Sequence, residues 1–328
     1  MTHRSLILSL ALMASAAHAQ VLKDPQWQAW LDSGRTAELT QAAQARLSAQ
    51  PDDSQAAVAL ALVAVEEGQP ARLDAVLKPV QACADRQPAQ AACFYALGTV
   101  QGVQAMTGGM MAGIRLAAKV KDNLSRAVEL DPMLFEARQA LSQFYLVAPG
   151  MAGGSVSKAK DLAAAAQAKQ PEHAKLLRAQ IALQDKQWPE AERELQSVRP
   201  GDDKTLAIEV RQTWAQLGTG YFGDKQFPKA RGVFEQLMRD APMQAIGPYG
   251  LARVMTETAQ PDEAVKLLER ARALEGADRL PIDHRLGIAL LAKGDKPAAK
   301  QALERFVISK KPNPRNLEDA RKRLAELS

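Results

Sequence analysis

Apolar residues in the second half of the chain recur every third or fourth position, which is the period of a helix with one buried face. Between residues 214 and 221, this face consists of Trp214, Leu217, Gly218 and Tyr221. After the turn residues 223–226, a second face consists of Phe227, Ala230, Phe234 and Leu237. Pro242 follows and cannot continue a helix. The pattern predicts two antiparallel helices joined by a short turn.

The same pair of helices recurs along the chain. In steps of 34 and then 35 residues, Leu217 aligns with Leu251 and Leu286. The other aligned positions stay apolar: Ala252, Ala264, Leu268 and Ala271, then Gly287, Ala299, Leu303 and Phe306. One hairpin cannot bury its apolar face alone, so neighbouring hairpins must stack. Because strand-like alternation is absent, the sequence predicts an all-α solenoid of stacked antiparallel helix hairpins.

Residues 214–242 resemble the repeat of the tetratricopeptide repeat (TPR) family. They carry Trp214-x2-Leu217-Gly218-x2-Tyr221, followed by Ala230-x3-Phe234-x2-Leu237 and Pro242. In this motif the small residues let two helix backbones approach closely. The resemblance covers nearly all of the chain after its first residues. It implies a right-handed, TPR-like superhelix whose inner face is lined by the first helix of each hairpin.

The repeats divide the chain into four parts. We expect a leader over residues 1–19 and degenerate TPR-like hairpins with two insertions over 20–205. Regular repeats follow over 206–312, and a capping helix over 313–328, with Asn316 as its candidate N-cap.

The first residues read as a secretory signal peptide. Arg4 precedes an apolar run over residues 6–13, and the letters AHA precede Gln20. A membrane anchor is the alternative, but the run is short for a stable span. We therefore expect cleavage near Ala19, a periplasmic or secreted protein, and no stable membrane insertion. In such an oxidising compartment Cys83 and Cys93 should form a disulfide, although two buried free thiols are the alternative.

The sequence does not predict an enzyme. The letters GTGYFG at 218–223 match G-x-G-x-x-G, but a dinucleotide loop needs a preceding strand and a helix that starts at the glycines. Beyond the leader there are two histidines, His173 and His284, and we interpret His284 as a groove or surface residue. No catalytic motif, cofactor site or metal site is predicted. The net charge of +5 is interspersed with acidic residues, so nucleic acid is not an expected partner.

Two insertions depart from the repeat spacing. The sequences are QGVQAMTGGMMAGIR at 101–115 and YLVAPGMAGGSVSKA at 145–159. We expect both to be glycine-rich loops on one edge of the solenoid. Their methionines are Met106, Met110, Met111 and Met151. Three interpretations stay open: the methionines fill a gap at the loop base, form a lip that contacts a partner, or bind a soft metal such as copper(I) through their thioethers.

The inner face of the first helices is the other candidate site. By the repeat spacing, its lining includes Tyr95, Thr99, Gln139, Gln143, Phe222, Tyr249 and Arg253. Amide and guanidinium groups suit a peptide backbone or carboxylate, and aromatic rings suit apolar side chains. An ordinary solvated face is the alternative. We expect an exported scaffold that binds a protein or peptide of the cell envelope in this groove. A carrier of a small ligand or soft metal, acting through the methionine-rich insertions, is the alternative function.

Overall fold

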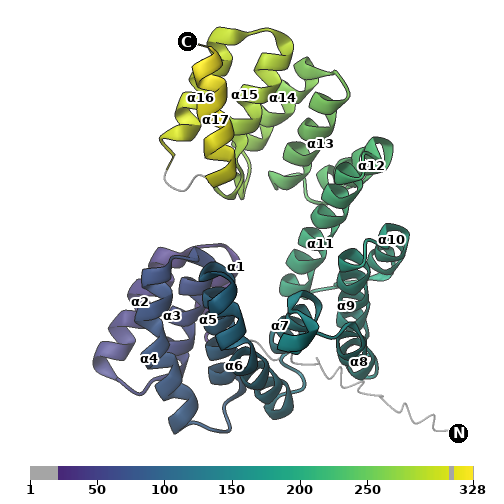
Figure 1. Ribbon diagram of the computed structural model, residues 1–328. Helices are drawn as coiled ribbons and strands as arrows, with labels where there is room; N and C mark the ends of the chain where they lie inside the picture. Colours follow the sequence, from purple (N-terminus) through teal and green to yellow (C-terminus); the bar gives the residue numbers. More distant parts are fainter. Residues whose placement is uncertain (1–20, 310–313, 328) are drawn as a thin grey trace, which may run out of the picture. The chain divides into compact units, whose positions relative to one another are not determined.

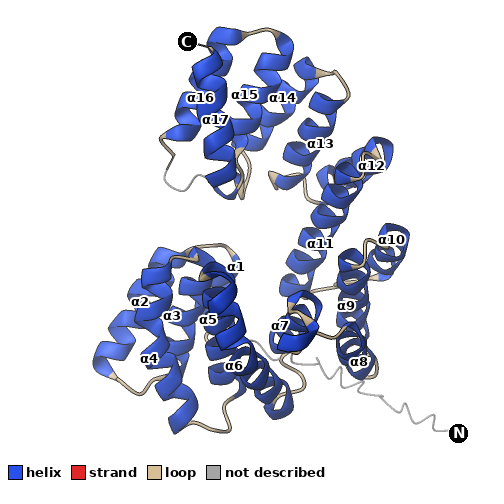
Figure 2. Cartoon of the chain, in the orientation of Figure 1, coloured by secondary structure: helices blue, strands red, loops and turns tan. Residues whose placement is uncertain are grey.

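The computed structural model describes residues 21–309 and 314–327, and these fold into helices without a β-strand among them (Figures 1 and 2). The chain forms two compact units, the first ending at Ala159 and the second beginning at Lys160. This boundary falls inside helix α8 (Val156–Ala166). The architecture is an all-α helical repeat, as the apolar pattern predicts. The division predicted at residue 205 concerns the regularity of the repeats and stays a prediction.

The first unit consists of successive antiparallel helices that pack on their chain neighbours. Alternate helices also contact each other, α3 with α5 and α5 with α7. The helices are α1 (Pro25–Asp32), α2 (Thr36–Ala49), α3 (Ser54–Glu67), α4 (Pro70–Arg86), α5 (Ala91–Thr107), α6 (Gly109–Leu130) and α7 (Phe135–Val147), followed by the short 3₁₀ helix η1 (Gly150–Ala152).

The second unit is built from successive helix hairpins of different lengths. Its elements are α9 (Pro171–Gln184), α10 (Trp188–Ser197), α11 (Lys204–Gly223), α12 (Phe227–Asp240), α13 (Ile246–Glu257), α14 (Pro261–Arg272), η2 (Ala277–Arg279), α15 (Ile282–Lys293), α16 (Lys296–Val307) and α17 (Pro314–Glu326). The first helices of the hairpins contact each other in series, α9 with α11, α11 with α13, and α13 with α15. These helices therefore lie side by side within the unit.

The turns inside these hairpins share one geometry. The residue before each N-cap has a positive φ: Lys186, Lys225, Ala259 and Gly294. The next backbone N–H donates to the carbonyl five residues earlier, as from Gln226 to Tyr221 at 2.8 Å. This bond satisfies a carbonyl that the end of the first helix leaves free. A proline then occupies the first turn of α10, α12, α14 and α16, where its missing N–H costs nothing.

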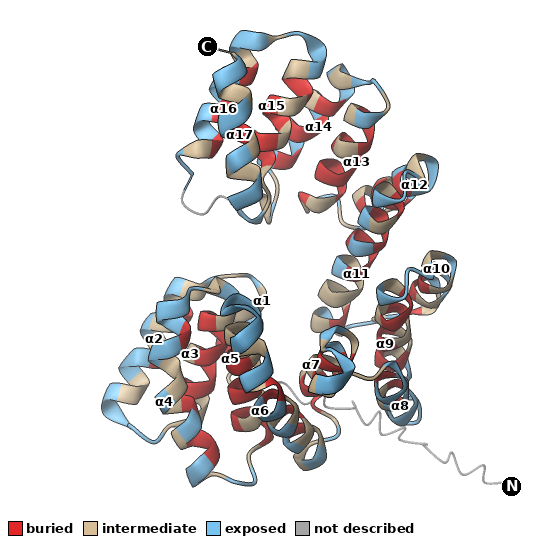
Figure 3. Cartoon of the chain, in the orientation of Figure 1, coloured by how far each residue is buried: buried red, intermediate tan, exposed pale blue. Residues whose placement is uncertain are grey.

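Close contacts between a small and a large residue hold each hairpin together, and buried residues line the facing sides of the helices (Figure 3). A Cβ atom built on Gly218 would lie 2.8 Å from Cζ of Phe234. Equivalent close approaches join Gly98 to Leu124 and Gly287 to Leu303. The predicted core is confirmed: Leu217, Tyr221, Ala230, Phe234 and Leu237 are buried, as are their counterparts in the next two hairpins.

The predicted disulfide is present. Cys83 in the last turn of α4 is bonded to Cys93 in the first turn of α5, with 5.6 Å between their Cα atoms. The bond closes the short α4–α5 connection of the first unit.

The first insertion is helical, so the prediction of a loop there is wrong. Its residues lengthen α5 and α6, and Gly108 alone separates the two helices. Gly109 makes the sharp corner possible with a φ of +77°. Packing along the extended α5–α6 pair outweighs the low helix propensity of its glycines. The interpretation of the methionines as gap fillers is also wrong, because Met106, Met110 and Met111 are exposed.

The second insertion is a loop, as predicted. It contains η1, and Ser155 donates its backbone N–H to the Tyr145 carbonyl at 2.8 Å. Met151 in η1 is almost fully exposed, so it does not fill a gap either. At the C-terminus α17 begins at Pro314, so Asn316 lies inside the helix and is not its N-cap. The predicted leader lies outside the described residues.

We expect Gly218→Ala to lower the free energy of unfolding by about 1–3 kcal/mol, because the new methyl group must displace the Phe234 ring. Gly232 in α12 is the matched control, since no atom lies within 4 Å of a Cβ built there. Gly232→Ala should stabilise the fold by about 0.5–1 kcal/mol through helix propensity. Chemical denaturation measures both. Equal effects of the two substitutions would show that the Gly218 contact does not limit helix spacing.

We expect Cys83→Ala/Cys93→Ala to lower the free energy of unfolding by about 3 kcal/mol, because the unfolded chain loses a closed loop. Denaturation with and without a thiol reductant provides the control. The reductant should lower the free energy of unfolding of the native protein by the same amount and leave that of the double variant unchanged. A double variant as stable as the oxidised protein would contradict the expectation.

Candidate functional site

The first helices of the second unit bring an aromatic ring and two guanidinium groups onto neighbouring helices. Phe222 lies at the end of α11, Arg253 in α13 and Arg285 in α15. All three side chains are half-buried, so each keeps part of its surface open to solvent. Because α13 contacts both α11 and α15, the three residues lie on neighbouring helices.

Arg253 rests on an aromatic surface. Its guanidinium carbon lies 4.4 Å from the centre of the Phe222 ring, which is a cation–π distance. Phe222 in turn meets Phe227 edge to face, with 5.7 Å between ring centres. The planar guanidinium group is therefore fixed in orientation by stacking. Phe222 and Arg253 are both predicted to lie on the groove face, and the two side chains are in contact.

Arg253 and Arg285 are both incompletely paired. The Nε atom of each is buried and has no hydrogen-bond acceptor within the described part of the chain. Burial lowers the pKa of Arg253, and the nearby charge of Arg285 lowers it further, while Tyr249 and Glu257 oppose the shift. Two cations thus lie within electrostatic range of each other. Elsewhere in the unit, by contrast, Arg231 pairs with Glu235 and Arg272 with Asp283.

Arg211 in α11 adds a third cation to the first helices, with a different environment. Burial lowers the pKa of Arg211, but the carboxylate of Glu275 acts in the opposite direction. Gln244 in turn donates to the Glu275 carboxylate at 2.6 Å. Arg211 therefore has an acidic neighbour whose charge balances part of its own.

Tyr249 is predicted to line the groove, but it is buried. Its side chain is only 7% exposed, so the ring belongs mainly to the core below Arg253. Arg253, one turn later in α13, is half-buried and keeps part of its surface open to solvent.

The other four predicted groove residues lie in the first unit, on α5 and α7, which contact each other. Tyr95 and Gln139 are half-buried, and Gln143 is exposed. The Thr99 hydroxyl donates within its own helix, to the carbonyl oxygens of Tyr95 and Ala96 at 3.0 and 2.9 Å. Its donor capacity is thereby used by the helix. These four residues and the Phe222–Arg253 pair belong to different units.

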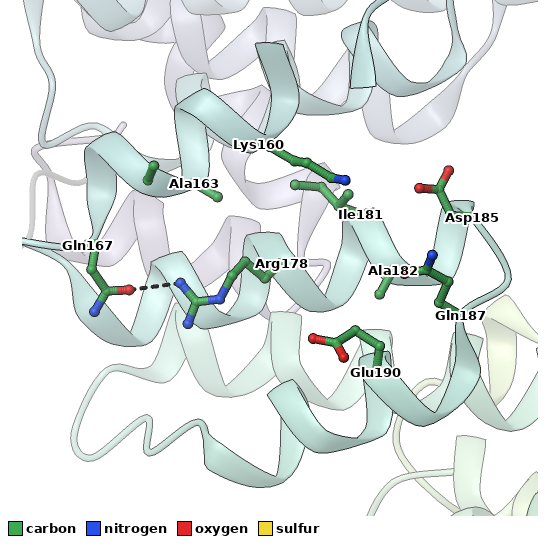
Figure 4. A pocket seen from close by; sticks show the side chains of 10 residues that line it. Lys160, Ala163, Gln167, Arg178, Ile181, Ala182, Asp185, Gln187 and Glu190 are labelled. Atoms are coloured by element: carbon green, nitrogen blue, oxygen red, sulfur yellow. Dashed lines mark hydrogen bonds between the residues drawn. The ribbon is translucent and has the colours of Figure 1, made fainter. Parts of the chain in front are cut away.

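A cavity of about 550 Å³ lies among α8, α9 and α10 in the second unit (Figure 4). Its apolar lining consists of Ala163, Ala164, Ile181 and Ala182. Charged groups of both signs surround these residues: Lys160, Arg178, Asp185 and Glu190. Arg178 is already held by Gln167 at 2.8 Å and Glu194 at 3.0 Å. The mixed lining favours no single class of ligand. Sequence reasoning did not anticipate this cavity.

The methionine-bearing segments do not form one cluster around α6. Met110 and Met111 lie in its first turn, whereas the second loop meets α6 beside Lys121, near Gly153. Lys121 is about 15 Å along the helix from Met111, from a rise of about 1.5 Å per residue. The described residues also contain no group of three or more His, Cys, Asp or Glu side chains that could hold a metal.

The G-x-G-x-x-G letters belong to a helix. Gly218, Gly220 and Gly223 all lie within α11, and a Cβ on Gly220 would meet the Trp188 ring at 2.8 Å. Gly218 and Gly220 therefore serve packing, whereas no atom lies within 4 Å of a Cβ built on Gly223.

His284 is buried, so its interpretation as a groove or surface residue is wrong. Its Nε2 lies 2.7 Å from Oδ2 of Asp319 in α17, and its ring packs on Phe306. Asp319 also accepts from Arg323 Nε at 2.7 Å. Burial lowers the pKa of His284, and the Asp319 carboxylate opposes this shift. A neutral imidazole therefore donates to Asp319 and fastens α17 to α15.

No family model and no curated protein matches this chain. The chain does resemble solved structures. A tetratricopeptide repeat protein from Parabacteroides merdae is 16% identical, with a TM-score of 0.49, over 83% of this chain and 98% of that one. PilF of Pseudomonas aeruginosa is 16% identical, with a TM-score of 0.44, over 73% and 99% of the two chains. YrrB, a TPR protein with an unusual peptide-binding site, is 11% identical, with a TM-score of 0.33, over 74% and 97%. At these identities the likeness concerns the helical repeat fold alone.

We expect acidification to loosen α17. Because the pKa of His284 is lowered in the folded state from an ordinary value of 6.5, the unfolded chain takes up a proton that the folded chain resists. Stability should therefore fall as the pH drops below about 6.5. The pKa of Asp319 is also lowered, so a further loss follows only in stronger acid.

His284→Gln keeps a donor for Asp319 but cannot titrate. Its unfolding free energy should change less than that of the native protein between about pH 7 and pH 5. Denaturation at a series of pH values measures the difference between the two slopes. Identical slopes would show that His284 does not control the docking of α17.

Proposed function

We propose that this protein is an exported scaffold that binds another protein or peptide of the cell envelope along the first helices of its second unit. The observation that carries the proposal is the unpaired state of Arg253 and Arg285, whose buried Nε atoms find no acceptor among the described residues. The proposal includes no catalysis and no cofactor. A periplasmic or secreted location follows from the leader-like first residues.

A carboxylate is the ligand group that best completes this face. A buried N–H without an acceptor costs about 1–3 kcal/mol, which an incoming ligand recovers by accepting the bond. Carboxylates bind guanidinium groups through short, charge-assisted and often paired hydrogen bonds. Since Arg253 is already oriented by Phe222, little further ordering is needed. An acidic side chain or a chain terminus of the partner fits this requirement.

The aromatic pair next to Arg253 supplies the apolar part of the contact. Phe222 and Phe227 are half-buried and leave part of their rings open. Aromatic and arginine side chains commonly carry most of the energy of a protein interface. We therefore propose that the bound segment places an apolar side chain beside its carboxylate. In the first unit, Gln143 of α7 offers an exposed amide for a separate contact.

A carrier of a small ligand or soft metal is the second candidate function. The observation that favours it is the exposure of three thioethers at the α5–α6 corner, Met106, Met110 and Met111. Thioether sulfur is a ligand for copper(I). Metal analysis of the purified protein tests this alternative directly.

We expect Arg253→Gln/Arg285→Gln to weaken partner capture tenfold or more, which corresponds to about 1.4 kcal/mol. The native protein and the variant are immobilised, and proteins retained from an envelope extract are identified and quantified. Isolated acidic peptides from a retained protein are then titrated against both. Arg231→Gln/Arg239→Gln, on the exposed side of α12, is the matched control and should bind like the native protein.

Both Arg253 and Arg285 are partly open to solvent, so circular dichroism and melting temperature should change little in the variant. If a folded Arg253→Gln/Arg285→Gln variant captures the partner as well as the native protein does, the proposal that this face binds the partner is wrong. The carrier function would be favoured over the scaffold by two results together. The purified protein would contain copper that is lost when Met106, Met110 and Met111 are substituted, and the arginine variant would capture partners as well as the native protein does.

A further inference from the structure

An exposed apolar surface lies where α5 meets α6, and we call it the hairpin-tip surface. It consists of Met106 in the last turn of α5, with Met110, Met111 and Ile114 in the first turns of α6. These side chains are 73, 79, 75 and 58% exposed, respectively. Soluble monomers rarely leave neighbouring large apolar side chains so open unless the surface contacts something.

The surface continues along α6 as two rows of side chains four residues apart, which are neighbours on a helix. The first row is Met110, Ile114 and Ala118, and the second is Met111, Arg115 and Lys119, all of them exposed. The buried side of the same helix carries Ala117, Val120, Leu124 and Ala127. Apolar and cationic side chains therefore lie together on the solvent-exposed side of α6, which is separate from its buried side.

Basic residues are concentrated beside this surface on α6. Residues 87–121 contain no acidic residue, and the basic residues among them are Arg115, Lys119 and Lys121. The first carboxylate on α6, Asp122, lies 3.4 Å from Lys121 Nζ. On the adjacent helix α4, Asp74 accepts a hydrogen bond from Gln104 at 2.7 Å. Asp122 thus lies close to a cation and Asp74 accepts a hydrogen bond from a neutral amide, whereas Arg115 and Lys119 have no ion pair in the part of the chain that the structure describes.

We propose that the hairpin-tip surface docks reversibly on an anionic phospholipid bilayer. Met110, Met111 and Ile114 enter the boundary between headgroups and acyl chains, and Arg115 and Lys119 contact the lipid phosphates. Apolar side chains beside a cationic row are the combination that holds a helix in a membrane interface. Long basic side chains can keep their charge at the headgroups while their stems lie on apolar surface.

Docking of this kind is peripheral. Among residues 21–309 and 314–327, no helix is both long and apolar enough to cross a membrane. A second copy of the chain is a poorer occupant, because a symmetric contact through the hairpin tips would bring the two cationic rows together. The surface is distinct from the Arg253–Arg285 face, which lies in the other unit.

Vesicle sedimentation tests the proposal with the full chain. We expect binding to vesicles of phosphatidylcholine mixed with phosphatidylglycerol, weaker binding to phosphatidylcholine alone, and loss of binding in high salt. Met110→Asp/Met111→Asp should reduce binding to the mixed vesicles by about tenfold or more. Arg115→Gln/Lys119→Gln should remove most of the preference for the anionic lipid.

Matched controls come from the second unit. Met243→Asp places the same change at a methionine that is 62% exposed. Lys296→Gln/Lys300→Gln removes two exposed cations with the same four-residue spacing on α16. Both controls should bind like the native protein. All variants carry the same N-terminus, so any contribution from the leader cancels in the comparison. Circular dichroism confirms that the exposed substitutions leave the fold intact.

Several outcomes overturn the proposal. One is that the native protein binds neither kind of vesicle. A second is that Met110→Asp/Met111→Asp binds as strongly as the Met243→Asp control. A third is that the native protein does not bind vesicles but forms a dimer in analytical ultracentrifugation, and that the tip substitutions dissociate this dimer. That result would assign the surface to self-association. Arg253→Gln/Arg285→Gln should bind vesicles normally, so failure of the groove proposal remains distinguishable from failure of this one.

Discussion

The close contact between a small residue on one helix and a large residue on the next determines the rest of this structure. Where Gly218 meets the Phe234 ring, the two backbones approach as closely as side-chain packing allows. Gly287 and Leu303 make the same kind of close contact in the α15–α16 hairpin. With that spacing fixed, first helices lie beside first helices. Residues distant in sequence, such as Phe222 and Arg253, therefore meet on one face.

The repeat, its core and the disulfide could be predicted because their signals are local: a helical period, recurring small residues and two nearby cysteines. The α5–α6 corner could not be predicted in this way. Its glycines indicate a loop by propensity, but the long antiparallel packing of α5 on α6 overrides that preference. Gly108 and Gly109 allow a tight turn between the two helices and do not form a long loop. The sequence shows that extra residues are inserted here, but their helical conformation depends on tertiary contacts.

The candidate site was predicted in part. Spacing within one repeat placed Phe222 and Arg253 on the open face, but it also placed Tyr249 there, and the Tyr249 ring is buried. Arg285 occupies a different position in its repeat from Arg253, so repeat alignment could not relate the two. His284 meets Asp319 across 35 residues, one repeat length, and this spacing was a usable signal. What sequence reasoning lacked was the orientation of each helix about its own axis.

The turn inside each hairpin of the second unit has a consequence for how such a chain can change length. The left-handed residue is lysine at 186 and 225, alanine at 259 and glycine at 294, so the turn fixes a backbone shape while its side chain stays variable. Each hairpin also carries its own first-turn proline and its own carbonyl-satisfying bond. The conformation of this turn is therefore set by residues of its own hairpin. Whole hairpins can therefore be duplicated or removed with this inner turn kept intact, whereas the connections between hairpins differ, as η2 between α14 and α15 shows.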